Sequence, residues 1–120
     1  MSNKTRVLVL EDQMLVAFGL KAALEAGGYE VVGPVAGLEE AQSVPPTTFD
    51  IAVLDINLGD DTDSTPYADD LVAAGIPFAF LSGYGSAAEL HERFSEIERL
   101  RKPIGKDELI DAVKELATSL

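Results

Sequence analysis

Short apolar runs alternate with longer segments of helical spacing along the chain. Each short run is bounded by Gly, Pro or acidic residues and is too short for a helix, which is typical of a buried strand. These runs predict strands at residues 6–10, 30–36, 51–54, 78–81 and 99–101, the last of them weak. The segments that follow them predict helices at residues 14–26, 38–44, 67–74, 86–97 and 107–120.

Five strand-helix units in succession define the fold class. Strands that are apolar along their whole length are buried on both faces of a sheet. Strands that alternate with helices pair in parallel through right-handed crossovers. We therefore predict an open α/β sandwich around a five-stranded parallel sheet, and a length of 120 residues fits one domain, residues 1–120.

Polar side chains stand where four of the predicted strands end. Glu11 and Asp12 follow the first strand, Asp55 the third, Ser82 the fourth and Lys102 the fifth. Ligands of open α/β sheets bind beyond the carboxyl ends of the strands, so we expect these side chains to converge. Three carboxylates at one edge repel one another and need a cation, and their hard oxygens suit Mg²⁺.

These strand-end residues suit phosphoryl transfer. A carboxylate can attack phosphorus and form an acyl phosphate if a divalent cation and a positive side chain neutralise the phosphoryl oxygens. Asp55 is the candidate nucleophile, Lys102 pairs with one phosphoryl oxygen and Ser82 donates to another. The candidate ligands of Mg²⁺ are Glu11, Asp12, Asp55 and the carbonyl of Asn57. Singly, an acid at a strand end is more often a turn or cap residue, but the combination favours this site.

Glu11-Asp12, Asp55, Ser82 and Lys102-Pro103 resemble the motif of response-regulator receiver domains over nearly the whole chain. The resemblance implies a (βα)₅ flavodoxin-like three-layer sandwich and a cis peptide between Lys102 and Pro103. It implies Mg²⁺-dependent transfer from a phosphohistidine of a sensor histidine kinase, or of a histidine phosphotransfer protein, onto Asp55. The domain would then switch partner binding or act as a phosphate sink, and it would be no enzyme beyond assisting its own phosphorylation and dephosphorylation.

The chain departs from the common receiver pattern at one position. Arg99 stands where receivers usually carry Tyr or Phe, three residues before the lysine. The segment Phe80-Leu81-Ser82-Gly83-Tyr84 resembles the Phe-Ala-Thr-Gly-Tyr signature of single-domain receivers that lack this aromatic and are associated with HWE-type histidine kinases. The candidate switch residues are therefore Ser82 and Tyr84, although Tyr84 could equally be an exposed loop aromatic.

The predicted helix at residues 14–26 is apolar on nearly every face. The residues that suffice for a core stripe are Leu15, Val16, Leu20, Ala23 and Leu24. A second stripe at helical spacing consists of Met14, Phe18 and Ala22. Receivers dock this helix on the kinase, so Met14 and Phe18 are the candidate partner contacts, with packing under a neighbouring loop as the alternative.

Charge and composition exclude several function classes. Nine basic and twenty-one acidic residues give a formal net charge of −12, which repels nucleic acids and anionic membranes. The chain has no Cys and therefore no disulfide or thiolate chemistry. It also lacks an apolar run of the roughly 20 residues that a membrane helix needs. We expect a cytoplasmic monomer or weak dimer that binds neither nucleic acid nor membrane.

Other functions fit the sequence less well. A haloacid-dehalogenase-type phosphatase needs a second acid two residues after its nucleophile, and that residue here is Asn57, which cannot protonate a leaving group. Residues 83–88 fit the nucleotide-binding pattern G-x-G-x-x-A but belong to the fourth unit instead of the first. Residues 55–66 lack the glycine and glutamate positions of a calcium loop. His91 has no second metal ligand at suitable spacing.

Overall fold

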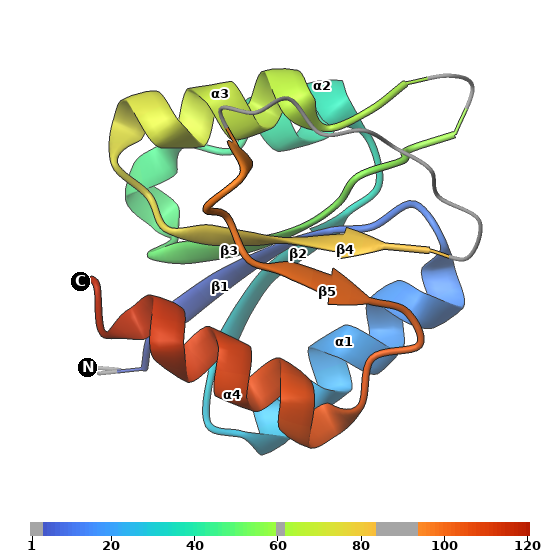
Figure 1. The fold of residues 1–120 in the computed structure, drawn as a ribbon, viewed down its shortest axis with the longest axis vertical. Coiled ribbons are helices and arrows are strands. Elements are labelled where there is room, and N and C mark those ends of the chain that lie inside the picture. The colour runs from blue at the N-terminus through green and yellow to red at the C-terminus, as the bar shows by residue number, and fades with distance from the viewer. Residues whose placement is uncertain (1–3, 60–61, 84–93) are drawn as a thin grey trace.

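The fold is built on five parallel strands in the order β2-β1-β3-β4-β5 (Figure 1). The structure is a computed structural model that describes residues 4–59, 62–83 and 94–120. The strands are β1 (Arg6–Leu10), β2 (Glu30–Val35), β3 (Ile51–Asp55), β4 (Phe78–Ser82) and β5 (Arg99–Arg101). Every neighbouring pair of strands is parallel, so the predicted five-stranded parallel sheet is confirmed.

Helices cover both faces of the sheet and complete three layers. The described helices are α1 (Met14–Ala26), α2 (Leu38–Gln42), α3 (Thr65–Ala74) and α4 (Lys106–Ala117), with a short 3₁₀ helix at Pro46–Thr48. α1 and α4 lie on one face, and α2 and α3 lie on the other (Figure 1). None of the described helices combines the length and the apolar character needed to cross a membrane.

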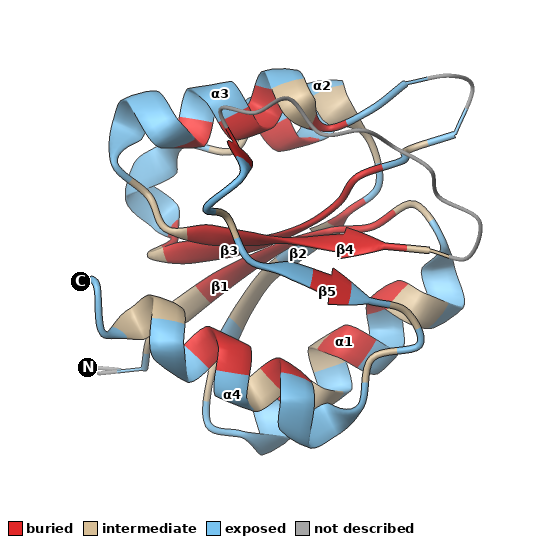
Figure 2. Cartoon of the chain, in the orientation of Figure 1, coloured by how far each residue is buried: buried red, intermediate tan, exposed pale blue. Residues whose placement is uncertain are grey.

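The central strands β1, β3 and β4 are buried on both faces, and Figure 2 shows them as the buried centre of the molecule. Successive side chains alternate between the two halves of the core. In β1, Leu8 and Leu10 join the cluster under α2 and α3, whereas Val7 and Val9 join the cluster under α1 and α4. Each such side chain contributes about 1.5–3 kcal/mol on burial, which explains why these strands read as continuous apolar runs.

The predicted end of the fourth helix, at residue 97, is wrong. Residues 94–97 form a turn in which the backbone N–H of Ile97 donates to the carbonyl of Phe94 at 3.0 Å. Phe94 is buried and packs edge-on against Phe80, with 5.5 Å between the ring centroids. This aromatic contact ties the segment to the core just before β5. The rest of the predicted helix, residues 86–93, lies outside the described residues.

α1 faces the sheet with a stripe that differs from the predicted one. Ala17, Leu20 and Leu24 are buried, whereas Leu15 is 90% exposed, so its assignment to the core was wrong. Each helical residue is rotated by about 100° from the last, which carries Leu15 away from the face that contacts the sheet. Because the whole helix is apolar, the sequence pattern does not reveal this orientation.

Two peptide bonds before proline are cis in the described residues. The bond between Lys102 and Pro103 is cis, as the family resemblance implies, and the bond between Gly33 and Pro34 is a second, unpredicted case. Gly33 has φ of +96°, and a Cβ at this position would lie 2.7 Å from the backbone nitrogen of Val35. Only glycine therefore fits this irregularity in β2.

Candidate functional site

The candidate site lies where the strand order of the sheet reverses. The chain runs from β1 outward to β2 and returns to β3 on the other side of β1, which opens a crevice at the carboxyl ends of β1 and β3. Glu11 and Asp12 follow β1, and Asp55 is the last residue of β3. One carboxylate oxygen from each of these residues lies within 4.8 Å of the others. The fold thus brings together the three acids that the sequence analysis grouped.

Glu11 is fully buried and is fixed at the junction of β1 and α1. Its backbone N–H donates to the carbonyl of Val35 at 3.0 Å, and its Oε2 accepts from the backbone N–H of Gln13 at 3.1 Å. Asp12 is only partly buried and lies opposite Gly59, where a Cβ would stand 3.5 Å from Asp12 Oδ2. Glu11 is therefore the interior acid of the pair, and Asp12 is the one that water reaches.

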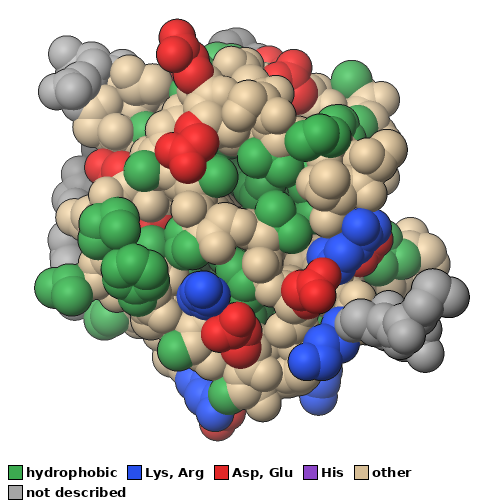
Figure 3. All heavy atoms as spheres, turned by 180° about the vertical axis from the view of Figure 1, so that it is seen from behind, with side chains coloured by type: hydrophobic (Ala, Val, Ile, Leu, Met, Phe, Trp, Pro, Cys, Tyr) green, Lys and Arg blue, Asp and Glu red, His purple; other side chains and the backbone are tan. Residues whose placement is uncertain are grey.

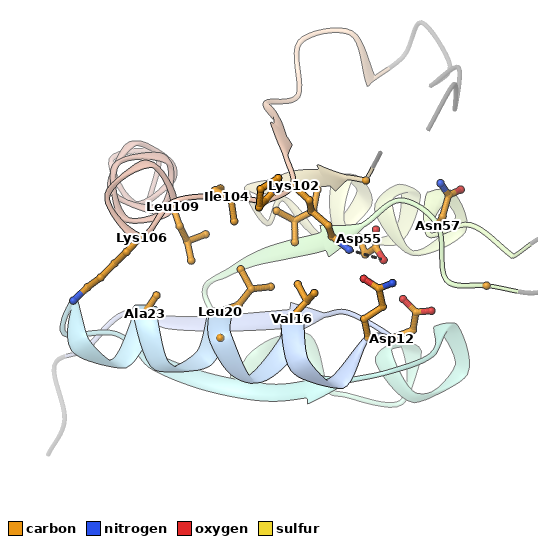
Figure 4. Close-up of a pocket in the computed structure, with 16 residues that line it drawn as sticks. Asp12, Val16, Leu20, Ala23, Asp55, Asn57, Lys102, Ile104, Lys106 and Leu109 are labelled. Carbon is orange, nitrogen blue, oxygen red and sulfur yellow. Dashed lines mark ion pairs between the residues drawn. The ribbon is translucent and has the colours of Figure 1, made fainter. Parts of the chain in front are cut away.

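Lys102 supplies the positive charge of the site. Its Nζ lies 2.5 Å from Glu11 Oε1 and 3.3 Å from Asp55 Oδ2, and Figure 4 shows the pairing with Asp55. The backbone N–H of Lys102 donates to the carbonyl of Ser82 at 2.8 Å, which anchors the lysine directly after β5. Three carboxylates against one ammonium leave a formal charge of −2 when all four groups are ionised.

The crowding of the acids changes their ionisation. Burial raises the pKa of Asp55 to about 7, the negative charge of Glu11 acts in the same direction, and Lys102 opposes both. Burial alone would lower the pKa of Lys102, but its hydrogen bond to Glu11 and the charge of Asp55 outweigh burial and raise it. Near neutral pH, Lys102 is therefore charged while Asp55 in the metal-free site is partly protonated.

The other predicted site residues lie at the same edge or outside the described residues. Ser82 is buried at the end of β4, one residue beyond Leu81, which is the register partner of Asp55. Asn57 is exposed, lines the same cavity as Asp55 and forms an isolated β-bridge with Asp63. Outside the described residues lie Tyr84, His91 and residues 84–88 of the nucleotide-binding pattern.

The residues at this edge fit a divalent cation with oxygen ligands. All three acids offer hard carboxylate oxygens, the donor type that Mg²⁺ prefers. Glu11 Oε1 is buried, and the ammonium of Lys102 lies 2.5 Å from it. A bound cation would compensate the negative charge of Glu11, which adds to the effect of burial on the pKa of Asp55. The donor set therefore suits Mg²⁺.

A cavity of about 870 Å³ extends from the acidic crevice between α1 and α4. Figure 4 shows Val16, Leu20 and Ala23 of α1 on one wall, with Ile104 and Leu109 on the other. The pattern of residues along the sequence does not predict this cavity. No local signal could have revealed it, because its two walls are far apart in the sequence and meet only in the folded chain. The crevice can thus accommodate a polar group beside an apolar one.

Solved structures of known proteins match nearly the whole chain. No family model and no curated protein matches the sequence. Among solved structures, SdrG from Sphingomonas melonis Fr1 is 35% identical, with a TM-score of 0.81 over 98% of this chain and 99% of that chain. The BeF3-activated conformation of SdrG from Pseudomonas melonis Fr1 is 36% identical, with a TM-score of 0.78 over 97% and 98%. The signal receiver domain of a modulated diguanylate cyclase from Desulfovibrio desulfuricans G20 is 28% identical, with a TM-score of 0.79 over 98% and 97%.

Proposed function

The chain belongs to the receiver domains of response regulators, which act as phosphoacceptors in two-component signalling, and from this premise we propose that Asp55 accepts the phosphoryl group. The donor is a phosphohistidine of a sensor histidine kinase or of a histidine phosphotransfer protein. The observation that carries the proposal is the position of Asp55 at the strand-order reversal, with its Oδ2 3.3 Å from Lys102 Nζ and two further acids beside it.

The chain's own residues have separate roles in the transfer. A carboxylate oxygen of Asp55 attacks phosphorus, the phosphorus–nitrogen bond to the imidazole breaks, and the electron pair of that bond stays on the nitrogen. The product is an acyl phosphate on Asp55. Lys102, already paired with Asp55, pairs with one phosphoryl oxygen, and the hydroxyl of Ser82 donates to another. Both contacts stabilise negative charge on the transferred group.

We propose that Mg²⁺ is the cofactor of this transfer. The residues that would hold it are Glu11, Asp12, Asp55 and the backbone carbonyl of Asn57. When bound, the ion supplies positive charge next to the phosphoryl oxygens. The support for this ligand set is the excess negative charge of the crevice and the hard oxygen donors that line it.

Intact mass measured after incubation with acetyl phosphate and Mg²⁺ tests the acceptor. We expect the wild type to gain the mass of one phosphoryl group and Asp55→Asn to gain none. Asp111→Asn, which removes an exposed carboxylate of α4, is the matched control and should react as the wild type does. A mass gain in Asp55→Asn equal to that of the wild type would show that another residue is the acceptor.

We propose that the outer face of α1 contacts the phosphodonor protein. Met14 is 56% exposed and Phe18 is 52% exposed, and Leu15 lies beside them. In the view from behind, hydrophobic side chains gather over the amino-terminal end of α1 (Figure 3). Gly19, next to Phe18, lines the mouth of the cavity between α1 and α4, and a Cβ at this position would meet nothing within 4 Å. Packing within the chain therefore gives no reason for a mid-helix glycine, whereas the close approach of a second helix does.

A comparison of a protein phosphodonor with acetyl phosphate separates docking on α1 from the phosphoryl-transfer reaction itself. We expect Phe18→Asp to slow transfer from a phosphorylated kinase or phosphotransfer protein by about tenfold or more and to leave the reaction with acetyl phosphate unchanged. Leu120→Asp is the matched control, because Leu120 is 65% exposed and lies after α4. Equal slowing with both donors, or equal slowing by both variants, would contradict docking through α1.

We also propose that the domain belongs to the receivers without the fifth-strand aromatic, which are associated with HWE-type kinases. Arg99 is an exposed residue of β5, and Phe80 to Ser82 of the signature form the buried end of β4. In such a domain Ser82, together with Tyr84, reports phosphorylation. Ser82→Ala should still accept the phosphoryl group but should lose the phosphorylation-dependent change in the amide NMR spectrum.

A further inference from the structure

A second cavity lies at the opposite edge of the sheet from Asp55. It has a volume of about 450 Å³ and sits between the end of α3, the start of β4, the segment before β5 and the end of α4. Its apolar lining consists of Val72, Ile76, Pro77, Phe78, Ile97 and Leu116. Val72 is 57% exposed, so the apolar lining reaches the surface. This volume accommodates one or two large side chains of another molecule.

Three carboxylates surround this apolar cavity. Glu96 and Glu98 come from the segment before β5, and Glu115 comes from the last turns of α4. All three are exposed. Within residues 4–59, 62–83 and 94–120, no ion pair or side-chain hydrogen bond engages any of them. The cavity therefore combines an apolar interior with a negatively charged rim that has no compensating cation in the described chain.

We propose that this cavity binds a cationic amphipathic segment of a partner protein. An apolar side chain of that segment enters between Val72 and Leu116, and its lysine or arginine side chains pair with the three carboxylates. A segment with alternating apolar and basic positions offers both features at the required spacing. A lipid surface or a nucleic acid would bring phosphates against the glutamates, and a second copy of this chain would bring its own charge of −12.

The position of the cavity separates it from the phosphoacceptor crevice. β4 begins at Phe78 in the cavity and ends at Ser82 in the crevice, and the segment with Glu96 and Glu98 leads through β5 to Lys102. The two sites thus occupy opposite ends of the same two strands. Binding at the cavity leaves the crevice open, and this proposal is independent of the identity of the phosphodonor.

A synthetic amphipathic peptide of leucine and lysine is the probe. We expect saturable binding to the full chain by calorimetry, with amide NMR shifts centred on Val72, Ile97 and Leu116. A peptide in which glutamate replaces lysine should not bind. The triple variant Glu96→Gln, Glu98→Gln and Glu115→Gln should weaken binding by about tenfold or more. The amide spectrum of each variant verifies that it is folded.

A matched triple variant distinguishes binding at the cavity from nonspecific attraction of the cationic peptide to the acidic chain. Glu25→Gln, Glu39→Gln and Asp111→Asn remove the same charge from exposed positions of α1, α2 and α4. This control should weaken binding by less than about twofold. Equal weakening by the two triple variants would overturn the proposal, because the peptide would then respond only to net charge. Absence of saturable binding, or shifts in these residues on concentrating the chain alone, would overturn it as well.

Discussion

The two ends of the sheet each gather three carboxylates, but in opposite surroundings. At the carboxyl end the acids are wholly or partly buried, and two of them pair with Lys102. At the amino end they are exposed, and no lysine of the described residues forms an ion pair with them. The first group is Glu11, Asp12 and Asp55, and the second is Glu96, Glu98 and Glu115. Water solvates exposed charges well, whereas buried charges repel strongly unless a cation compensates them. The comparison indicates that charge repulsion opposes folding at the carboxyl end of the sheet more than at the amino end.

The largest effect should follow loss of the lysine. Lys102→Met leaves the buried Glu11 without its ion-pair partner, so we expect the free energy of unfolding to fall by about 3 kcal/mol without Mg²⁺ at pH 8. Urea denaturation measures this change. The control is Lys106→Met, an exposed lysine on the rim of the same cavity, which should change stability by less than about 0.5 kcal/mol. Equal losses in the two variants would show that the pairing of Lys102 with Glu11 does not account for the effect.

Neutralising Asp55 should stabilise the fold. The pKa of Asp55 is about 7 in the folded chain against an ordinary value of 3.8, so the folded state binds more protons between these values. Stability due to this group therefore falls as pH rises from about 4 to 7 and is constant above. We expect Asp55→Asn to be more stable than the wild type by about 2 kcal/mol at pH 8, allowing for solvent screening, with most of the gain absent at pH 4.

Urea denaturation of both proteins without Mg²⁺, at pH 4 and pH 8, measures the difference. The matched control is Glu98→Gln, which removes one charge from the amino end. A loss of stability in Asp55→Asn at pH 8 would show that Lys102 overcompensates the repulsion among the acids.

Mg²⁺ should stabilise the folded chain by binding at the carboxyl end of the sheet. At about ten times its Kd the ion should raise the free energy of unfolding by about 1.4 kcal/mol, because it binds the folded chain and not the unfolded one. Asp12→Asn should remove most of this gain, since it deletes one of the grouped acids. The measurement is the melting temperature across a Mg²⁺ titration. An equal gain in Asp12→Asn and the wild type would place the stabilising ion elsewhere.

The smallest effect belongs to the amino end. Glu98→Gln should change the free energy of unfolding by less than about 0.5 kcal/mol, because the side chain is exposed and forms no ion pair with the described residues. The same urea series measures it. A change as large as that of Asp55→Asn would mean that the carboxylates at the two ends of the sheet affect the free energy of unfolding equally.

The sequence predicted the strand boundaries to within one residue because acids, Gly and Pro mark their ends. The edge strand β5 was the weakest signal, with only Leu100 buried, yet it lies where predicted. The turn at residues 94–97 was missed because it depends on the contact between Phe94 and Phe80, which helical spacing does not encode. Leu15 was misplaced because a helix that is apolar on every face does not reveal which face meets the sheet.

The convergence of the acids and the lysine was predictable, because the carboxyl ends of parallel strands meet at one edge. The sequence did not predict that Lys102 lies closer to Glu11 than to Asp55. That detail depends on how far each side chain reaches across the crevice. Neither cavity was predicted, since both are formed by elements that are distant in the sequence. The roles of the grouped residues stay predictions.

β5 has a consequence for the time scale of the site. It is a three-residue strand at the edge of the sheet and pairs on one side only, with β4. Edge segments with few ladder hydrogen bonds detach locally far more often than the whole domain unfolds. Local opening of β5 would move Lys102 away from the acids, which follow other strands. We therefore expect the ion pairs of the crevice to break more often than the whole domain unfolds.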